Sequence, residues 1–436
     1  MNTANRDIFY KRCKEYFGDR ADEFIGLLSK EAGSAFFLNE RKAEEKKILE
    51  LIDFEYERSA LSEKSFTYRC DSIGKTRAYE LGLIYPQDTE SSLPTAFVDT
   101  EGIRLAIDLC AAPGGKSVNI LNRLPDDALL IANDVSYKRA SVLSANLERL
   151  GLDRTAVTCK RPDLFEKDFR GVFDLVILDA PCSGEGMIRK YPEILDEYSI
   201  ANIRSLSQIQ KKLLETAYIL LNEGGQLLYS TCTYAFEEDE EQVRDFLSSH
   251  NDMELIKLPC LENSSRLEGT LKLSPLNGTE GQFMALFRKK GQLTEKKLKY
   301  RKTVRNELVE SFIRNELHID KYYLYNDEDR YYLSLYPLID IRDNVLCSGI
   351  YIGKIINRRF EPSHALYRAD SLIGKYKHVF DIDDREYDDF ISGKEVKTDR
   401  EDGWYMVSYR GHSLGHGKCS KGILKNKYPK GLRRMV

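Results

Sequence analysis

Between about residues 100 and 230, short apolar runs alternate with longer amphipathic runs. The apolar runs are "RLAIDLC" (104–110), "ALLIAND" (128–134), "FDLVILDA" (173–180) and "GGQLLYSTC" (224–232). The stretches between them, at 114–124, 137–151 and 200–222, have the apolar spacing of helices. Strands that alternate with helices of this length predict a parallel sheet with helical crossovers. The middle of the chain is therefore expected to form an α/β fold.

Length and composition set broad limits on the whole chain. Its 436 residues suggest two or three domains, and an apolar content of 42% is ordinary for globular cores. No apolar run approaches the ~18 residues that a membrane span needs. The N-terminal "MNTANRDIFYKRCKEYFGDR" has no apolar core of the kind found in secretory signals. A cytoplasmic protein without a membrane partner is expected.

The regions on either side of the α/β pattern differ from it. Residues 1–70 contain helix-like stretches at 7–17, 21–31 and 40–54 and a short strand at 34–39. The C-terminal part instead carries short β-like runs with Gly and Asp turns, at 329–337, 348–356 and 404–411. The expected domains are a small N-terminal α/β region (1–75), the α/β domain (76–290), a basic linker (291–305) and a β-rich C-terminal region (306–436).

Charge is segregated along the chain, although the net charge of −4 argues against a general polyanion binder. Residues 404–436 and 288–305 are rich in Lys and Arg, whereas "FDIDDREYDDF" at 380–390 is acidic. Such blocks favour local contacts with phosphates. Solvated loops and a basic tail explain the charge pattern equally well.

The first strand of the α/β pattern leads into a Gly-rich turn, "IDLCAAPGGKS" (107–117). A phosphate-binding Walker loop is rejected, because Cys110 occupies the position of its first Gly and Pro113 lacks a backbone N–H. Asp134 follows about 20 residues later at the end of the second strand, where related sheets bind ribose hydroxyls. The spacing favours a nucleoside without phosphates, and S-adenosylmethionine (SAM) is the obvious one. The alternative is a turn needed only for packing, with Asp134 as a helix cap.

The nine cysteines form no CxxC pair and have no histidine at metal-ligand spacing, so no metal site is expected. Two of them stand out, because Cys182 and Cys232 each follow a strand-like run, as does Asp179. Parallel strands bind ligands at their carboxyl ends, so these side chains could converge beside the Gly turn. Inert structural cysteines are the alternative, and that interpretation would be the better one for either cysteine alone.

A thiolate beside a methyl donor suggests methylation of cytosine at C5. The neutral ring is not nucleophilic at C5, but addition of a thiolate to C6 makes C5 enamine-like. A base must then remove the C5 proton so that the sulfur is expelled. An acid such as protonated Asp179 could stabilise charge on the ring. Amino-group methylation is disfavoured, since "DAPC" has Cys where such enzymes carry an aromatic residue.

These motifs together resemble the RsmB/RsmF/Sun family of RNA 5-methylcytosine methyltransferases. "DLCAAPGGKS" is similar to its SAM motif, "DAPCSGEGMIRK" to its Pro-Cys motif and "YSTCTYAFEEDEEQV" to its Thr-Cys-Thr motif. Segments 82–92 and 278–289 are also similar to family segments. Segments 353–366 and 403–434 resemble the C-terminal region of RsmF-type enzymes, which act on 16S rRNA and end in a PUA-like RNA-binding domain. The resemblance implies a Rossmann-like SAM-dependent methyltransferase sheet, with the small N-terminal region and the β-rich PUA-like domain attached.

The resemblance also assigns roles, which the residues alone leave open between Cys182 and Cys232. It implies Cys232 as the nucleophile, Cys182 as the residue that assists product release, and Lys190 as a contact to RNA phosphate or the base. A SAM site would be lined by Cys110, Ala111, Ala112, Pro113, Gly114, Gly115, Lys116, Asp134 and Asp179. Where the family carries an acidic or amide residue near the adenine, this chain has Arg161, with Asp163 two positions later. Asp163 is the candidate for that contact.

The expected function is thus methylation of C5 of a cytosine in rRNA, with SAM as cofactor. The expected partner is RNA, either free rRNA or rRNA within the small ribosomal subunit. A monomer is expected. The same chemistry on tRNA is the alternative. A non-catalytic RNA-binding ribosome assembly factor is an alternative of another class, but it would not need Cys182, Cys232 and Asp179 together.

Overall fold

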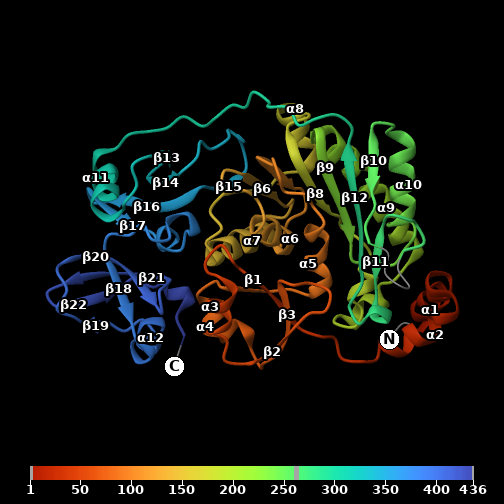
Figure 1. Cartoon of the computed structure of the whole chain (residues 1–436), viewed down its shortest axis with the longest axis horizontal. Helices are drawn as coiled ribbons and strands as arrows, with labels where there is room; N and C mark the ends of the chain where they lie inside the picture. The colour runs from red at the N-terminus through yellow and green to blue at the C-terminus, as the bar shows by residue number, and fades with distance from the viewer. Residues whose placement is uncertain (1–2, 260–264, 435–436) are drawn as a thin grey trace.

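The computed structural model describes residues 3–259 and 265–434. Its central sheet has the strand order β10-β12-β9-β8-β5-β6-β7-β15, with β11 paired to β12 (Figure 1). Strands β5 to β9 run parallel to one another, as the alternating pattern predicts. The strands are β5 (Leu105–Asp108), β6 (Leu129–Asn133), β7 (Thr155–Thr158), β8 (Phe173–Asp179), β9 (Leu221–Thr231), β10 (Met253–Ile256), β11 (Leu271–Leu273), β12 (Gln282–Lys289) and β15 (Val345–Ser348).

Helices cover both faces of this sheet, because neighbouring strand residues point to opposite sides. Ala106 packs into the core under α5, α6 and α7, while Leu105 and Ile107 pack into the core under α8, α9 and α10. The helices are α5 (Thr89–Ala96), α6 (Gly115–Leu121), α7 (Tyr137–Leu150), α8 (Glu166–Phe169), α9 (Ile200–Leu220) and α10 (Glu240–Ser249). The sheet is a Rossmann-like methyltransferase sheet, as expected from the sequence.

The N-terminal region forms a small antiparallel sheet of order β2-β3-β1-β4. Its strands are β1 (Ala35–Leu38), β2 (Glu55–Arg58), β3 (Ser65–Arg69) and β4 (Ile84–Pro86), and its helices are α1 (Thr3–Phe17), α2 (Ala21–Leu27), α3 (Glu45–Leu49) and α4 (Arg77–Glu80). The helix expected over 40–54 is limited to α3. Helices α1 and α2 lie apart from this sheet, below α10 in the view of Figure 1. There Phe9 and Phe24 share a core with Tyr234.

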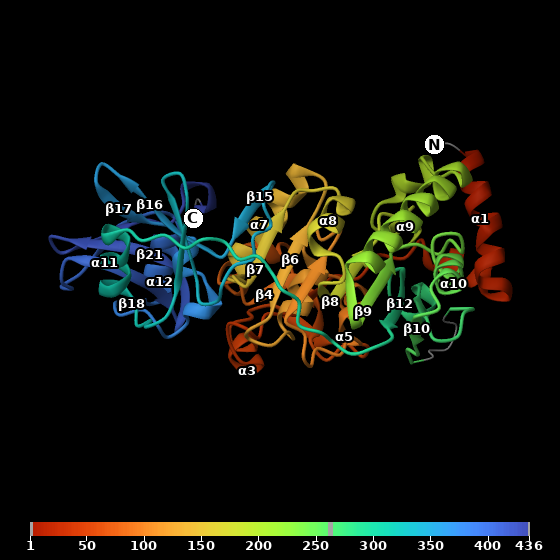
Figure 2. The ribbon, with the colours of Figure 1, turned by 90° about the horizontal axis from the view of Figure 1, so that it is seen from above.

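The C-terminal region contains two sheets, of order β13-β14-β16-β17 and β18-β20-β21-β22-β19. Figure 2 shows them at the opposite end of the elongated molecule from α1. The strands are β13 (Tyr323–Asp327), β14 (Arg330–Ser334), β16 (Ile350–Ile356), β17 (Arg359–Pro362), β18 (Val379–Ile382), β19 (Val396–Lys397), β20 (Gly403–Tyr409), β21 (His412–Ser420) and β22 (Ile423–Asn426); the helices are α11 (Glu307–Glu316) and α12 (Asp384–Ile391). The last sheet is the β-rich, PUA-like part.

Two strands connect these regions. β4 follows position 75 in sequence yet completes the N-terminal sheet beside β1. β15 comes from the C-terminal region yet extends the central sheet, where Cys347 pairs with Val157 of β7. Residues 290–306 link β12 to α11 without forming a helix or strand. None of the described helices is long and apolar enough to cross a membrane.

Candidate active site

The Gly-rich turn lies between the end of β5 and the start of α6. Gly114 has a φ of 122°, a conformation that residues with a Cβ rarely adopt. Asp108, the last residue of β5, is fully buried, and Ser117 Oγ donates a hydrogen bond of 2.7 Å to its Oδ2. Its Oδ1 has no hydrogen-bond partner among the described residues. Burial raises the pKa of Asp108 to about 7.

A cavity of about 390 Å³ opens between this turn, the N-terminal sheet and the segment after β8. Lys116 Nζ and Asp179 Oδ2 form an ion pair of 2.8 Å in its wall, and Ser230 Oγ donates to Asp179 Oδ1 at 2.7 Å. The cavity is lined by Ser34, Ala35, Tyr68, Tyr85, Pro86, Gln87, Asp88, Ser91, Asp108, Ala111, Ala112, Pro113, Gly115, Lys116, Asp179, Met187, Lys190 and Tyr191. It thus holds part of the predicted SAM set together with Asp179 and Lys190.

The two candidate cysteines lie side by side, with a distance of 3.4 Å between their sulfur atoms. The backbone N–H of Cys232 also donates to Cys182 Sγ at 3.4 Å. Both residues are half-buried. The hydrogen bond with Cys232, together with burial, raises the pKa of the Cys182 thiol. Neither thiol lines the cavity itself, but Cys182 follows Asp179 by three residues and Cys232 follows Ser230 by two.

Buried carboxyls hold the two cysteine-bearing loops together. Glu185 accepts hydrogen bonds of 3.0 Å from Thr233 Oγ1 and from the backbone N–H of Tyr234. Glu238 accepts one of 3.0 Å from the backbone N–H of Ser183. Burial raises the pKa of Glu238 to about 7. Each loop therefore carries a carboxyl that binds the other loop, and the sulfur–sulfur contact is fixed from both sides.

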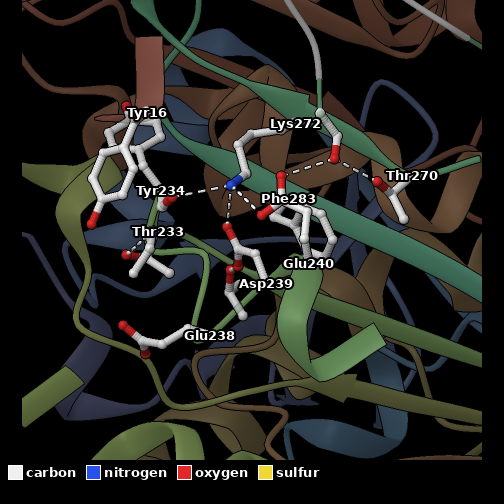
Figure 3. Close-up of polar contacts among 12 residues, drawn as sticks. Tyr16, Thr233, Tyr234, Glu238, Asp239, Glu240, Thr270, Lys272 and Phe283 are labelled. Atoms are coloured by element: carbon white, nitrogen blue, oxygen red, sulfur yellow. Dashed lines mark hydrogen bonds and ion pairs between the residues drawn. The ribbon is translucent and has the colours of Figure 1, made fainter. Parts of the chain in front are cut away.

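The loop after Cys232 is also bound by Lys272 of β11 (Figure 3). Lys272 Nζ lies 2.9 Å from Asp239 Oδ2 and 2.8 Å from Glu240 Oε2, and it donates to the backbone oxygen of Tyr234 at 3.0 Å. Burial alone would lower the pKa of Lys272, but the two carboxylates outweigh it and the pKa is raised. Asp239 and Glu240 of the acidic run after the Thr-Cys-Thr motif are thus paired with a buried cation.

Other predicted residues lie at or beyond the edge of the cavity. Asp134 is buried, and its Oδ2 forms an ion pair of 3.4 Å with Arg139 Nη1. Asp163 is exposed and forms an ion pair with Arg161 at 2.7 Å, so the structure does not bring it to the cavity wall. Cys110 and Gly114 belong to the turn but do not line the cavity. Lys190 forms a close ion pair with Asp88 at the wall.

The turn and cavity fit a SAM molecule. Gly114 and Gly115 present no side chain where the turn meets α6. A Cβ at Gly115 would come within 2.7 Å of Gln87 Nε2, so this position has no room for a larger residue. The unpartnered Oδ1 of Asp108 offers a buried acceptor to a ligand's amino group or hydroxyl. Among the described residues, no three His, Cys, Asp or Glu side chains are grouped as metal ligands.

Some residues of the site were not among those singled out from the sequence. Asp108 lies within the apolar run "RLAIDLC" and was not expected to be a site residue. An acidic residue at the carboxyl end of the first strand is nevertheless typical of the sheet edge where ligands bind. Asp88 lay in the family-like segment 82–92 without a role. Glu185 and Lys272 gave no signal, because their partners lie about 30 or more residues away in the chain.

Family models match two parts of the chain. Residues 97–288 match the family described as 16S rRNA methyltransferase RsmB/F. Residues 377–434 match the family described as the methyltransferase RsmF PUA domain. The first match spans the Gly-rich turn and both cysteine loops, and the second spans the last sheet.

Similar proteins agree with these matches. The chain is 27% identical over 452 residues to the ribosomal RNA small subunit methyltransferase F of Shewanella loihica, covering 95% of this chain and 92% of that protein. It is 34% identical over 290 residues to the tRNA (cytosine(49)-C(5))-methyltransferase of Pyrococcus abyssi, covering 62% of this chain and 93% of that protein.

Solved structures show the same fold. A methyltransferase homologue from Pyrococcus horikoshii aligns with a TM-score of 0.57 at 28% identity, covering 65% of this chain and 94% of that one. The catalytic motifs, the Rossmann-like sheet and the C-terminal module thus agree with the matches. The chain belongs to the RsmB/F family of SAM-dependent RNA methyltransferases, with an RsmF-type PUA domain at its C-terminal end.

Proposed function

We propose that this enzyme methylates C5 of a cytosine in the rRNA of the small ribosomal subunit, through a transient covalent bond between the enzyme and the base. The observation that carries the proposal is the pair of thiols 3.4 Å apart, beside the cavity that Asp179 and Lys116 line. Two inert structural cysteines would need neither partial exposure nor loops that are bound to each other by buried carboxyls.

Cys232 is proposed as the nucleophile. Its sulfur adds to C6 of the cytosine, and the electron pair of the C5–C6 double bond becomes available at C5. The pKa of the Cys182 thiol is raised by its hydrogen bond with Cys232 and by burial, which suits a Cys182 that stays protonated during this step. Once C5 carries the methyl group, a base removes the C5 proton, the C5–C6 double bond re-forms and the Cys232 sulfur leaves C6 as a thiolate. Cys182 assists this release by donating its thiol proton to the departing sulfur, and solvent then reprotonates Cys182.

Lys116 and Asp179 are proposed to orient the cytosine ring. Because Asp179 is paired with the Lys116 ammonium, its carboxylate is placed to accept a hydrogen bond from the N4 amino group. Lys116 then supplies the positive charge that the ring needs at N3 and O2 during addition. In this assignment Asp179 accepts a hydrogen bond from the base, whereas the sequence suggested a protonated Asp179 that donates one to the ring. Lys190 is proposed to contact the RNA after leaving Asp88.

SAM, held by Asp108, the turn from Cys110 to Lys116, and Asp134, would supply the methyl group to C5. Asp134 is proposed to bind the ribose hydroxyls, which requires that its contact with Arg139 be shared or exchanged. Asp163 can approach the adenine only if it separates from Arg161. This chain therefore offers a buried acceptor and the Gly turn to the cofactor, while Asp134 and Asp163 are each held in an ion pair.

Ribosomal RNA is favoured over tRNA as the substrate, because the rRNA-modifying relative aligns with a larger share of this chain than the tRNA-modifying relative does. The Shewanella loihica rRNA enzyme matches 95% of this chain, including the C-terminal region, whereas the Pyrococcus abyssi tRNA enzyme matches 62%. The C-terminal region (306–436) is proposed to hold flanking RNA through its basic residues, with 1–75 as a second RNA-binding region, 76–290 as the methyltransferase domain and 291–305 as the linker. A cytoplasmic monomer is proposed.

A labelling experiment tests the proposal. The purified enzyme and labelled SAM are incubated in parallel with small-subunit rRNA, whole small subunits and bulk tRNA, and methylated positions are mapped by bisulfite sequencing. We expect label at C5 of one or a few cytosines of the rRNA and none with Cys232→Ala. Label in tRNA alone would move the proposal to the alternative substrate. Label in no RNA would support a non-catalytic assembly factor.

A further inference from the structure

A second hollow adjoins the catalytic cavity. Its volume is about 360 Å³, within the range of about 300–1,000 Å³ that small-molecule sites occupy. Ser34, Ala35 and Asp88 line both spaces, so the two share a wall. The rest of its lining comes from β2 and β3, from the start of α5 and from residues 277–280. A ligand that fills the catalytic cavity could therefore extend into this hollow.

Glu90 is the residue of this lining that the fold does not explain. It is 4% exposed, and its carboxyl accepts a hydrogen bond from its own backbone N–H. The acidic neighbours differ, because Asp88 pairs with Lys190 and Glu280 pairs with Arg189 at 3.1 Å, whereas Glu90 forms no ion pair with any described residue. Burying a carboxyl without a cationic partner costs free energy, and folded proteins do so rarely.

The state of Glu90 suits a nucleobase. Burial, followed by the charge of Asp88, raises the pKa of Glu90 to about 8. At neutral pH the carboxyl is therefore mostly protonated and offers one donor and one acceptor. Every nucleobase presents a donor next to an acceptor on its Watson–Crick edge. Enzymes that act on single-stranded RNA read such splayed bases by hydrogen bonds to these edges.

The rim of the hollow carries a cation. Arg58 of β2 lines it, and its side chain is 44% exposed while paired with Glu45. An exposed guanidinium beside a base-sized hollow is placed to contact the phosphate of the nucleotide that enters. Glu90, inside the hollow, would then form hydrogen bonds with the base, and Arg58, at its edge, would contact the RNA backbone.

We propose that this hollow binds the nucleotide next to the target cytosine, with Glu90 hydrogen-bonded to the edge of its base and Arg58 near its phosphate. The inference rests on the proposed function, because it needs an RNA strand whose target base occupies the neighbouring cavity. A base taken out of the stack leaves its neighbours unpaired and free to be bound. The hollow thus helps to hold the strand beside the target, whichever base enters it.

The test uses the full-length enzyme and a short RNA that carries the mapped cytosine. Glu90→Leu removes the hydrogen bond and Glu90→Gln keeps a donor and an acceptor, so Leu should raise KM for RNA about tenfold, the effect of roughly one hydrogen bond. The Gln variant should stay within about threefold of wild type. kcat and KM for SAM should not change. Glu148→Leu is the control, since Glu148 also has a pKa raised by burial but lies on α7.

Two further RNAs, abasic at the nucleotide 5′ or 3′ of the target, complete a double-mutant cycle. With one of them the wild-type enzyme should lose about tenfold, and Glu90→Leu should lose nothing more. The proposal is overturned if neither abasic RNA weakens wild-type binding, or if the effect of Glu90→Leu is the same on all three RNAs. Methylation of the parent RNA by the wild-type enzyme keeps this outcome separate from a failure of the proposed function.

Discussion

At the scale of single residues, the site depends on where protons and charges are held. The Cys182 and Cys232 sulfurs lie 3.4 Å apart, so in the proposed mechanism one thiol stays protonated while the other reacts. Asp179 is tied to Lys116 and Ser230, which fixes its orientation toward the cavity. The chemistry therefore uses a few side chains that are already positioned by their neighbours.

Asp108 gives a prediction about pH and stability. An unfolded chain ionises aspartate near pH 4, whereas burial holds the pKa of folded Asp108 at about 7. Between these values the folded state keeps a proton that the unfolded state has lost, so this group makes the protein less stable as pH rises from about 4 to about 7. At pH 8, Asp108→Asn should increase the free energy of unfolding by roughly 1–4 kcal/mol and therefore raise Tm. Near pH 4 the substitution should have little effect on Tm.

Thermal unfolding of both proteins without SAM, at pH 4.5 and pH 8, checks this. Asp126→Asn is a control of opposite sign, because the hydrogen bond from Arg41 lowers the pKa of Asp126. Asp126 stabilises the fold above its unfolded pKa, so its loss should lower Tm at pH 8 or leave it unchanged. Equal Tm differences for Asp108→Asn at both pH values would contradict the account.

Residue-scale features were predictable from the sequence where a local motif carries them. The Gly turn, Asp179 and the two cysteines stand in short motifs at strand ends, and the structure places them around or beside one cavity. The burial of Glu90 and the partners of Lys272 were not predictable, because they depend on segments far apart in the chain. Asp163 had the right residue type but pairs with its neighbour Arg161.

At the scale of elements, the connection from β9 to α10 carries Cys232 and is supported from β11. Lys272→Met would leave the buried carboxyls of Asp239 and Glu240 without their cation (Figure 3). Breaking a buried pair in this way costs about 3–5 kcal/mol. We expect a large loss of Tm and loss of methyl transfer. Circular dichroism and labelled-SAM assays measure both, with the exposed Lys257→Met as control. A variant as stable as wild type would show that Lys272 does not hold this loop.

A second element-scale prediction concerns the contact between the loop after Cys182 and the start of β12. A Cβ on Gly281 would lie 2.3 Å from Gly186 Cα, and Gly186 N–H donates to the Cys232 carbonyl at 2.9 Å. Gly281→Ala must push these loops apart, so methyl transfer should fall at least tenfold. Gly26→Ala, in α2, is the matched control, because nothing lies within 4 Å of its Cβ position. The idea fails if both variants keep full activity under saturating RNA and SAM.

The alternation of strands and helices predicted the core elements of the central sheet. It did not predict β15, because the pairing of Cys347 with Val157 joins segments separated by the whole second half of the domain. The helix expected over 40–54 shrank to Glu45–Leu49, and strand β2 follows at Glu55. Helical periodicity in a charged stretch is a weak signal when the chain must return to a sheet.

At the scale of the whole molecule, the three regions are joined by buried polar contacts. Arg368 is 3% exposed, and its guanidinium donates at 2.7 Å to the backbone oxygens of Ser413, Glu80 and Arg149. These acceptors belong to the last sheet, the N-terminal region and α7. The C-terminal module is therefore held at a fixed position relative to the catalytic cavity, which suits an enzyme that must place one cytosine.

Arg368→Met tests this arrangement. The loss of three buried hydrogen bonds from a charged group should cost several kcal/mol and weaken RNA binding, while SAM affinity changes little. Calorimetry for SAM and filter binding for RNA separate the two effects. Arg314→Met, an exposed residue of α11, should stay within about 0.5 kcal/mol of wild type. RNA affinity that is unchanged in Arg368→Met would contradict a fixed C-terminal module. A truncation before 306 is less informative, because it would also remove β15 from the central sheet.

The most direct test of the central claim is detection of the covalent bond between enzyme and RNA. Cys182→Ala and Cys232→Ala are each incubated with SAM and the substrate RNA, and the products are separated on a denaturing gel. The account predicts an RNA–protein band that persists in Cys182→Ala, where release is impaired, and is absent in Cys232→Ala. A band in Cys232→Ala would reverse the two roles, and methylation by Cys232→Ala at the wild-type rate would contradict covalent catalysis by this thiol.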